Sequence, residues 1–347
     1  MSSLKIQLKD RQSNELFPVT LASCVNDTEQ GKSQAEINRM LLSNNSEVFY
    51  VRRVGDNLSH VSEVEAGTWL GGMGMSNGFA MCVFNKGKFL LLDGDSFGIV
   101  AKGQLPQYGN NFHGNNVSFS NIYDSGSTLP RAYVSETREQ SGASSHSTHR
   151  CFAYKLGMDG SAELVQTITY IGSAMSNYAK TVDWAIDRYT NLLYAYNPTI
   201  LDSSIESFAV RLDVMRYNLP GSEESSVSLS DADSLDSGIY TSFQLRGVLQ
   251  GAVVRNGVML VAWSANVNQS VIKVSRSGIA VYDLGKKQLL ADIDLSDYLP
   301  ASNGTGVYEI EGIDIHCGKI YATFHQYDEN DANMEFVEVN YPGLFRI

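Results

Sequence analysis

The stretch Gln250–Trp263 reads QGAVVRNGVMLVAW. Two apolar runs flank an Asn-Gly pair, which readily adopts the positive φ angles of the tight turn between two antiparallel strands. The stretch therefore predicts a β-hairpin. Residues 78–93 predict a second one, because apolar runs again flank a glycine-containing turn, at residues 85–87.

These hairpins belong to a chain whose composition favours strands throughout. Its 347 residues include 18 Tyr, 14 Phe and 30 Gly, while only 7 are Pro and 18% are charged. Aromatic side chains suit pleated surfaces, and glycine suits tight turns. From about residue 66 onward, turn residues separate apolar runs at the short spacing of an all-β domain. We therefore expect an all-β fold.

A weak internal repeat separates two all-β architectures. The hairpin at 250–263 is followed by a strand at 278–285 that ends in an Asp-containing turn, and by an outer strand at 289–295. Residues 311–324 and 73–94 open in a similar way. A four-stranded unit that repeats every ~40–50 residues is typical of a β-propeller. We predict about six blades, with five or seven also compatible, and keep a pair of β-sandwiches as the alternative.

The first 60 residues differ from the rest and are predicted to be a separate docking segment. Residues 16–25 look extended, and Ser33–Glu36 forms a capping box that begins a short helix. We therefore divide the chain into an extended arm with a short helix (1–60) and a β-propeller (61–347). The residues expected to dock this arm are Phe17, Pro18, Val19, Thr20, Val25, Ile37, Met40 and Leu41.

The arm also resembles a known kind of segment. Leu16–Thr20, Cys24–Asp27 and Gly31–Ser33 are similar to an N-terminal segment of tail and tail-fibre proteins of bacteriophages that infect gut anaerobes, including the crAss-like phages. Residues 113–119 and 129–135 resemble propeller blades from the same phages and their bacterial hosts. The resemblance implies a non-enzymatic tail protein, assembled in the host cytoplasm and present in several copies. Its arm would bind other virion proteins, and its propeller would contact neighbouring virion proteins or a host surface polysaccharide.

The central channel is where a propeller most often holds a ligand. Residues 309–313 resemble the Glu-Gly turn of metal-dependent propeller lactonases, in which the Glu binds Ca²⁺. A metal-dependent hydrolase or lactonase is therefore one alternative function, and a scaffolding propeller encoded by a cell is another. Against the metal site, Glu311 can simply end a strand while Gly312 allows close packing of blades. The candidate channel residues are His113, Asn115, Glu311, Asp314 and His316.

Other motifs for chemistry are weak. The acidic turns at residues 93–95 and 328–333 could hold Ca²⁺, but neither continues into a complete calcium-binding loop, so we expect ordinary turns and no cofactor. The sequence contains no nucleophile elbow, no HExxH motif and no phosphate-binding loop. We therefore expect a binding or structural protein.

Aromatic side chains in the first half of the chain are the other hint of function. Tyrosine and tryptophan rings stack on sugars, although most such residues in a propeller belong to its core. The residues concerned are Tyr108, Phe112, Tyr123, Tyr178, Trp184, Tyr189, Tyr194 and Tyr196.

The remaining features limit partners and environment. The net charge of −12 without a basic stripe disfavours nucleic acid, and no apolar run is long enough for a membrane span. Four well-separated cysteines, mostly in apolar runs, indicate buried free thiols in a reducing compartment. Two polar insertions, at 136–149 and 221–238, are expected to be exposed loops.

Overall fold

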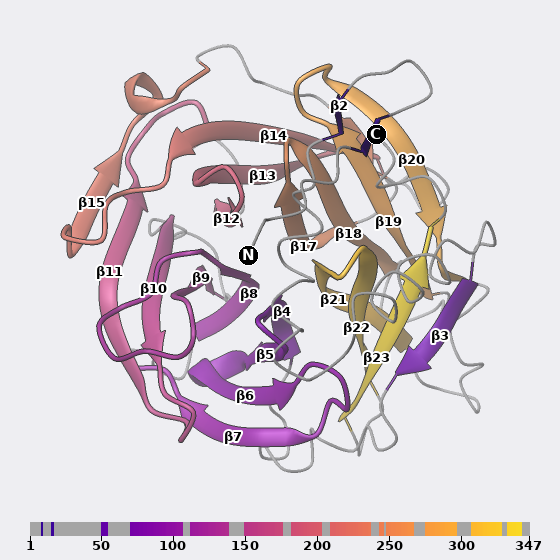
Figure 1. Cartoon of the computed structure of the whole chain (residues 1–347). Coiled ribbons are helices and arrows are strands. Elements are labelled where there is room, and N and C mark those ends of the chain that lie inside the picture. The colour runs from indigo at the N-terminus through magenta and orange to yellow at the C-terminus, as the bar shows by residue number, and fades with distance from the viewer. Residues whose placement is uncertain are drawn as a thin grey trace.

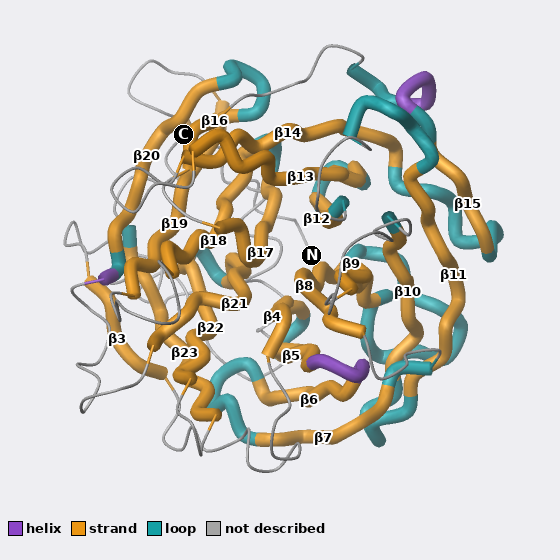
Figure 2. Tube along the Cα trace, turned by 180° about the vertical axis from the view of Figure 1, so that it is seen from behind, coloured by secondary structure: helices purple, strands orange, loops and turns teal. Residues whose placement is uncertain are grey.

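The chain folds into a five-bladed β-propeller, seen along its axis in the computed structural model (Figure 1) and from the opposite side in Figure 2. The all-β prediction is confirmed, and the blade number is at the lower end of the expected range. The structure describes residues 8–9, 15–16, 50–54, 70–106, 112–138, 149–175, 182–202, 209–236, 243–245, 248–266, 275–296, 307–327 and 332–341.

Each blade is an antiparallel sheet that begins with a strand near the axis and ends with one at the rim. Blade 1 contains β4 (Leu70–Ser76), β5 (Phe79–Phe84), β6 (Lys88–Asp93) and β7 (Ile99–Gln104). Blade 4 contains β17 (Val248–Arg255), β18 (Val258–Asn266), β19 (Ser275–Asp283) and β20 (Gln288–Asp294). Both predicted hairpins are confirmed as β5–β6 and β17–β18.

Turn chemistry explains why the inner hairpins close where they do. Asn256 and Gly257 have φ angles of 50° and 77°, the left-handed values that a two-residue hairpin turn requires at both central positions. The equivalent turns of blades 1 and 5 have the same left-handed pairs, at Asn77–Gly78 and Cys317–Gly318. The weak sequence repeat therefore reflects the same type of turn in the inner hairpins of blades 1, 4 and 5.

Blades 2 and 3 depart from the simple pattern. Blade 2 contains β8 (Phe112–Phe119), β9 (Ala132–Arg138), β10 (Arg150–Leu156) and β11 (Ala162–Tyr170). Blade 3 contains β12 (Asp183–Asp187), β13 (Leu192–Asp202), β14 (Ala209–Asn218) and β16 (Phe243–Leu245). Between β14 and β16 the chain leaves blade 3 and adds β15 (Ser226–Leu229) to blade 2, parallel to β11 (Figure 1).

The predicted loop at 221–238 is therefore largely ordered. In addition to β15 it contains the short 3-10 helix η4 (Asp231–Asp233); a second one, η3 (Asn85–Gly87), lies between β5 and β6. The Gln166 side-chain amide donates to the carbonyls of Gly221 and Glu224, and the Tyr170 hydroxyl donates to Asp231. These hydrogen bonds from blade 2 satisfy polar groups of the segment, so it can pack on the propeller without an apolar core of its own.

The ring closes through a strand from the start of the chain. Blade 5 contains β21 (Val307–His316), β22 (Lys319–Tyr327) and β23 (Ala332–Asn340), and its outer strand is β3 (Tyr50–Val54). Arg52 on β3 forms an ion pair with Glu338 on β23, with 3.1 Å between Nε and Oε1. Residues 50–54 fall in the predicted docking arm (1–60), but they form part of the propeller because they supply the last sheet with its outer strand.

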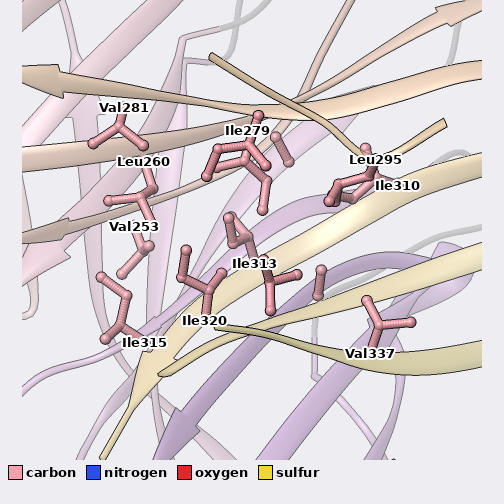
Figure 3. Close-up of a cluster of buried hydrophobic side chains, with 14 of the residues drawn as sticks. Val253, Leu260, Ile279, Val281, Leu295, Ile310, Ile313, Ile315, Ile320 and Val337 are labelled. Atoms are coloured by element: carbon pink, nitrogen blue, oxygen red, sulfur yellow. The ribbon is translucent and has the colours of Figure 1, made fainter. Parts of the chain in front are cut away.

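The core consists of five apolar clusters, one between each pair of neighbouring blades. Successive side chains of a strand point to opposite faces, so Val253 packs between blades 4 and 5, whereas Ala252 and Val254 pack between blades 3 and 4. Figure 3 shows the cluster between blades 4 and 5. This two-sided burial explains why the strands read as continuous apolar runs.

The arm itself remains largely a prediction. Two short strands, β1 (Leu8–Lys9) and β2 (Glu15–Leu16), pair with each other. All the proposed docking residues, from Phe17 to Leu41, and the predicted helix after Ser33 lie outside the described residues.

Candidate functional site

The inner strands run side by side in the same direction around the axis, and four of them are interrupted by a bulge. The antiparallel registers shift between Leu70 and Gly72 in β4, Gly114 and Val117 in β8, Leu249 and Ala252 in β17, and Ile310 and Gly312 in β21. A bulge bends its strand and redirects a side chain. We call the bulge residues Gly71, Asn115, Asn116, Gln250, Gly251 and Glu311 the axial layer.

Glycines allow the strands of this layer to touch. A Cβ atom on Gly71 would lie 1.9 Å from the carbonyl oxygen of Gly114, and one on Gly312 would lie 2.4 Å from the backbone nitrogen of Met73. A Cβ atom on Gly251 would lie 3.2 Å from the carbonyl oxygen of Glu311. At these points the neighbouring inner strands therefore lie too close together for a residue with a side chain.

Two asparagines join blades that are not neighbours. The Asn116 side chain donates to the carbonyls of Trp184 in blade 3 (2.8 Å) and Ala252 in blade 4 (2.9 Å), and accepts from the Ala252 N–H (3.2 Å). Asn115 donates to Asp183 (2.8 Å) and to the Gln250 carbonyl (2.9 Å). Since blades 2 and 4 are separated by blade 3, these bonds cross the axis and fasten the ring from inside.

Replacing Asn116 with leucine is expected to lower the free energy of unfolding by about 3–5 kcal/mol. The leucine has a similar size but removes the side-chain partner of the Ala252 carbonyl and N–H, and it leaves the Trp184 carbonyl with the Ser135 hydroxyl at 3.3 Å as its remaining side-chain donor. Each buried polar group that loses its partner costs about 1–3 kcal/mol. Denaturant unfolding of the purified variant measures the loss. The control is leucine at exposed Asn121, where we expect a change within about 0.5 kcal/mol; equal stability of the two variants would show that Asn116 does not fasten the ring.

A second polar group lies at the C-terminal ends of the inner strands. The Arg188 Nη1 atom donates to the Met75 carbonyl across the axis (2.8 Å), from blade 3 to blade 1. The Met75 N–H donates to Asp314 (2.6 Å), and Asp314 also pairs with Arg255 (2.5 Å). We call this end, including the turns that follow the inner strands, the inner-hairpin mouth.

The charged side chains of this mouth differ in how deeply they are buried. Desolvation lowers the pKa of Arg255, and the neighbouring Asp314 opposes that shift. Asp187 is fully buried at the end of β12, where it raises the pKa of Tyr194, already raised by burial, to about 12. Arg188, by contrast, is only half-buried. The accessible positive charge of the mouth therefore belongs to Arg188.

Two exposed tyrosines belong to the same end. Tyr189 is 36% exposed, and its ring centroid lies 5.4 Å from the Arg188 guanidinium carbon and 5.8 Å from that of Arg255. Tyr123 is 48% exposed and accepts a hydrogen bond from Asn77 in the first hairpin turn. The other described aromatics of the predicted set, Trp184, Tyr194 and Tyr196, are buried in the core. The sequence pattern alone did not distinguish the exposed tyrosines from the aromatic residues of the core.

The structure distributes the predicted channel residues over two inner strands, β8 and β21. Asn115 and Glu311 lie in the axial layer and are buried. His316 ends β21, five residues further on, and its ring packs 6.4 Å from that of Tyr321. Asp314 lies in the mouth, and His113 is the second residue of β8, where its side chain is not among those that the structure describes. Glu311 and His316 are therefore not brought together. Gly312 allows blades 5 and 1 to pack closely, which was the alternative to a metal site at Glu311.

The described residues hold no cluster of three or more His, Cys, Asp or Glu side chains that could bind a metal. In the acidic turn at 93–95, Asp93 accepts hydrogen bonds from the N–H groups of Asp95 and Ser96 and from the Ser96 hydroxyl, and those from Ser96 chiefly lower its pKa. Asp93 thus stabilises its own turn. Cys82 and Cys151 are buried free thiols, as expected, whereas Cys317 is free but exposed. In the described part of the chain, no helix is long and apolar enough to cross a membrane.

Comparisons with known proteins concern the fold. No family model and no curated protein matches the sequence. Among solved structures, the chain is similar to the tail fibre of Staphylococcus aureus phage P68, with a TM-score of 0.49 and 11% identity over 87% of this chain and 55% of the fibre protein. It thus spans about half the length of that protein. It is also similar to a glucose dehydrogenase, with a TM-score of 0.42 and 10% identity over 83% of this chain and 98% of the enzyme. Both likenesses are to proteins of very different sequence and describe the arrangement of strands alone.

Proposed function

We propose that this chain is a structural protein of a bacteriophage tail, anchored in the virion by the segment that precedes β3, with the propeller as a binding module for a host surface polysaccharide. The observation that carries the binding role is the inner-hairpin mouth. There exposed Tyr189 packs against half-buried Arg188, and exposed Tyr123 bonds to Asn77 in a hairpin turn at the same end of the propeller. Tyrosine side chains give contact area at low entropic cost, and a tyrosine that packs against guanidinium groups loses even less freedom on binding.

The virion part of the proposal rests on the sequence of the arm. Residues 16–33 resemble the N-terminal segment of phage tail proteins, and the structure has the chain entering the propeller through β3 at its rim. An arm attached there can reach a neighbouring protein while the mouth stays accessible. Several copies on one particle would turn weak contacts with a polysaccharide into firm attachment.

Purified particles test the virion role. We expect mass spectrometry to find the chain in density-purified virions, in several copies, and we expect its gene to lie beside genes for portal, capsid and tail proteins. A chain that is absent from particles, or a gene flanked by metabolic enzymes, would contradict the proposal. Particles that carry a chain without residues 1–49 would show that the arm is not the anchor.

Binding to cell-surface polysaccharide tests the propeller role separately. We expect the purified chain to bind polysaccharide extracted from host cells, and we expect Tyr189→Ala and Tyr123→Ala to weaken that binding. Ile171→Ala is the matched control, since Ile171 is 62% exposed and lies just after β11, outside the mouth. Equal loss in all three variants, or no loss in either tyrosine variant, would exclude the mouth as the binding surface.

A further inference from the structure

We infer that the inner-hairpin mouth binds a saccharide that carries a carboxylate, such as a uronic acid, with the carboxylate on Arg188 and the sugar ring against Tyr189. This inference rests on the proposed polysaccharide binding and assigns its chemical class. It follows from the unused hydrogen-bonding capacity of the mouth.

Arg188 has the donors to bind an anion. A guanidinium group carries five N–H donors in a planar fork that matches a carboxylate. Among the described residues, the hydrogen bond from Nη1 to the Met75 carbonyl is the one that Arg188 makes, and no described carboxylate pairs with it. That bond and the contact with the Tyr189 ring fix the side chain, so the fork is already oriented before a ligand arrives.

Arg255 is not the binding group, although it lies beside the same ring. Its Nη2 atom bonds to Asp314, its Nη1 atom bonds to the carbonyl of Val254, and the side chain is only 9% exposed. Its charge is thus matched within the protein. Arg255 instead packs near the Tyr189 ring, with its guanidinium carbon 5.8 Å from the ring centroid.

The mouth also contains an unused acceptor. One carboxylate oxygen of Asp187 accepts from the Tyr189 N–H (3.1 Å), while the other, Oδ2, is buried and has no hydrogen-bond partner among the described residues. A buried carboxylate oxygen without a donor is costly. A hydroxyl group, directly or through one water molecule, supplies what Asp187 lacks. A sugar acid combines such hydroxyls with an anion and an apolar ring face.

The local charge favours a carboxylate over a phosphate. Arg188 and Arg255 are opposed by Asp187 and Asp314, so the mouth is neutral without ligand, and the whole chain carries −12. One accessible guanidinium group can match one negative charge. A phosphate group carries up to two charges, and the second would meet the nearby carboxylates unmatched.

The two tyrosines give the site room for more than one sugar. Met75, which anchors Arg188, lies two residues before Asn77, which bonds to Tyr123. Arg188 and Tyr123 thus bond to positions two residues apart in blade 1, and we expect neighbouring sugars of one chain to contact both. The groups proposed to contact the ligand are few, so we expect a dissociation constant of roughly 0.1–10 mM for a short oligosaccharide.

The test compares acidic oligosaccharides with neutral counterparts. The probes are tetragalacturonate, a hyaluronan tetrasaccharide and sialyllactose, each paired with its carboxyl-reduced or unsialylated form, and binding to the full chain is followed by ligand-observed NMR. We expect at least one acid to bind about tenfold more tightly than its partner. Arg188→Gln should remove that difference, and Arg188→Lys, which keeps the charge but not the fork, should reduce it.

Controls separate binding from stability. Lys286→Gln removes a positive charge from a side chain that is 68% exposed at the turn between β19 and β20, and it should change nothing. Tyr189→Ala should weaken acidic and neutral probes alike, since ring contact does not depend on the carboxylate. Thermal unfolding shows whether each variant is folded, and Arg188→Lys keeps the test valid if Arg188→Gln is not.

Each outcome separates the two proposals. If acids bind no better than neutral sugars, or if both Arg188 variants keep the full difference, the carboxylate assignment is wrong while polysaccharide binding by the propeller stands. If no probe of either kind binds and host polysaccharide also fails to bind, the proposed binding role is wrong as well.

Discussion

Replacing Gly71 with alanine is expected to prevent stable folding of the propeller. The new Cβ atom would lie 1.9 Å from the carbonyl oxygen and 2.8 Å from the carbonyl carbon of Gly114. Both atoms belong to the backbone of β8, so no side-chain rotation relieves the clash. Blade 1 would have to move away from blade 2, which breaks the close packing of their shared core. Overpacking of a core commonly costs about 1–3 kcal/mol, and a backbone clash at the axis should exceed 4 kcal/mol.

Denaturant unfolding of Gly71→Ala beside Gly98→Ala measures this effect. Gly98 is exposed, has no positive φ angle, and its added Cβ atom would meet only the Ser96 hydroxyl, at 3.3 Å. We expect Gly98→Ala to stay within about 1 kcal/mol of the parent chain. A Gly71→Ala protein that unfolds at the same denaturant concentration as Gly98→Ala would show that the inner strands do not touch as described.

The hairpins and the repeat were predictable because their signals are local. Asn256–Gly257 determines its turn by its own φ preference, whatever the rest of the chain does. The blade number lies at the lower end of the expected range of five to seven because the repeats are unevenly spaced. An even spacing of repeats was assumed, but blades 2 and 3 together occupy residues 112–245, because the chain makes a detour to add β15 to blade 2.

The features that fasten the ring could not be predicted because their partners are distant in sequence. Asn116 acts through Ala252, which is 136 residues away, and Arg52 acts through Glu338, which is 286 residues away. Nothing near Asn116 distinguishes it from Asn115. The same holds for Arg188, whose importance depends on the carbonyl of Met75 in another blade. Asn115 and Asn116 also depend on the bulge in β8, and a bulge has no clear mark in the sequence of one strand alone.

Deleting residues 1–54 is expected to destabilise the propeller much more than deleting residues 1–49. Both deletions remove the arm, so the difference between them isolates β3. The strand gives blade 5 its fourth sheet member, and its valines pack on two clusters: Val51 between blades 4 and 5, and Val54 between blades 5 and 1. Two partly buried valines contribute about 1–2 kcal/mol each, and each strand hydrogen bond contributes about 1 kcal/mol.

The loss of Arg52 adds to this difference. The Glu338 side chain is only 2% exposed, and without Arg52 it keeps Lys319 and Tyr321 as its partners. The open edge of β23 would also present unpaired backbone groups to other chains. We therefore expect the longer deletion to cost at least 3 kcal/mol more than the shorter one, and to aggregate on concentration. Guanidinium unfolding and light scattering measure the two effects.

Equal stability of the two truncated chains would contradict closure of the ring by β3. If the difference is found, it also separates the two roles of the N-terminal region. The shorter deletion would then yield a folded propeller without its proposed anchor, which is the form needed to ask whether polysaccharide binding survives when incorporation into particles is lost. If the arm anchors the chain in a particle as proposed, any force on it would act directly on β3, the strand that closes the ring, because β3 follows the arm in the chain.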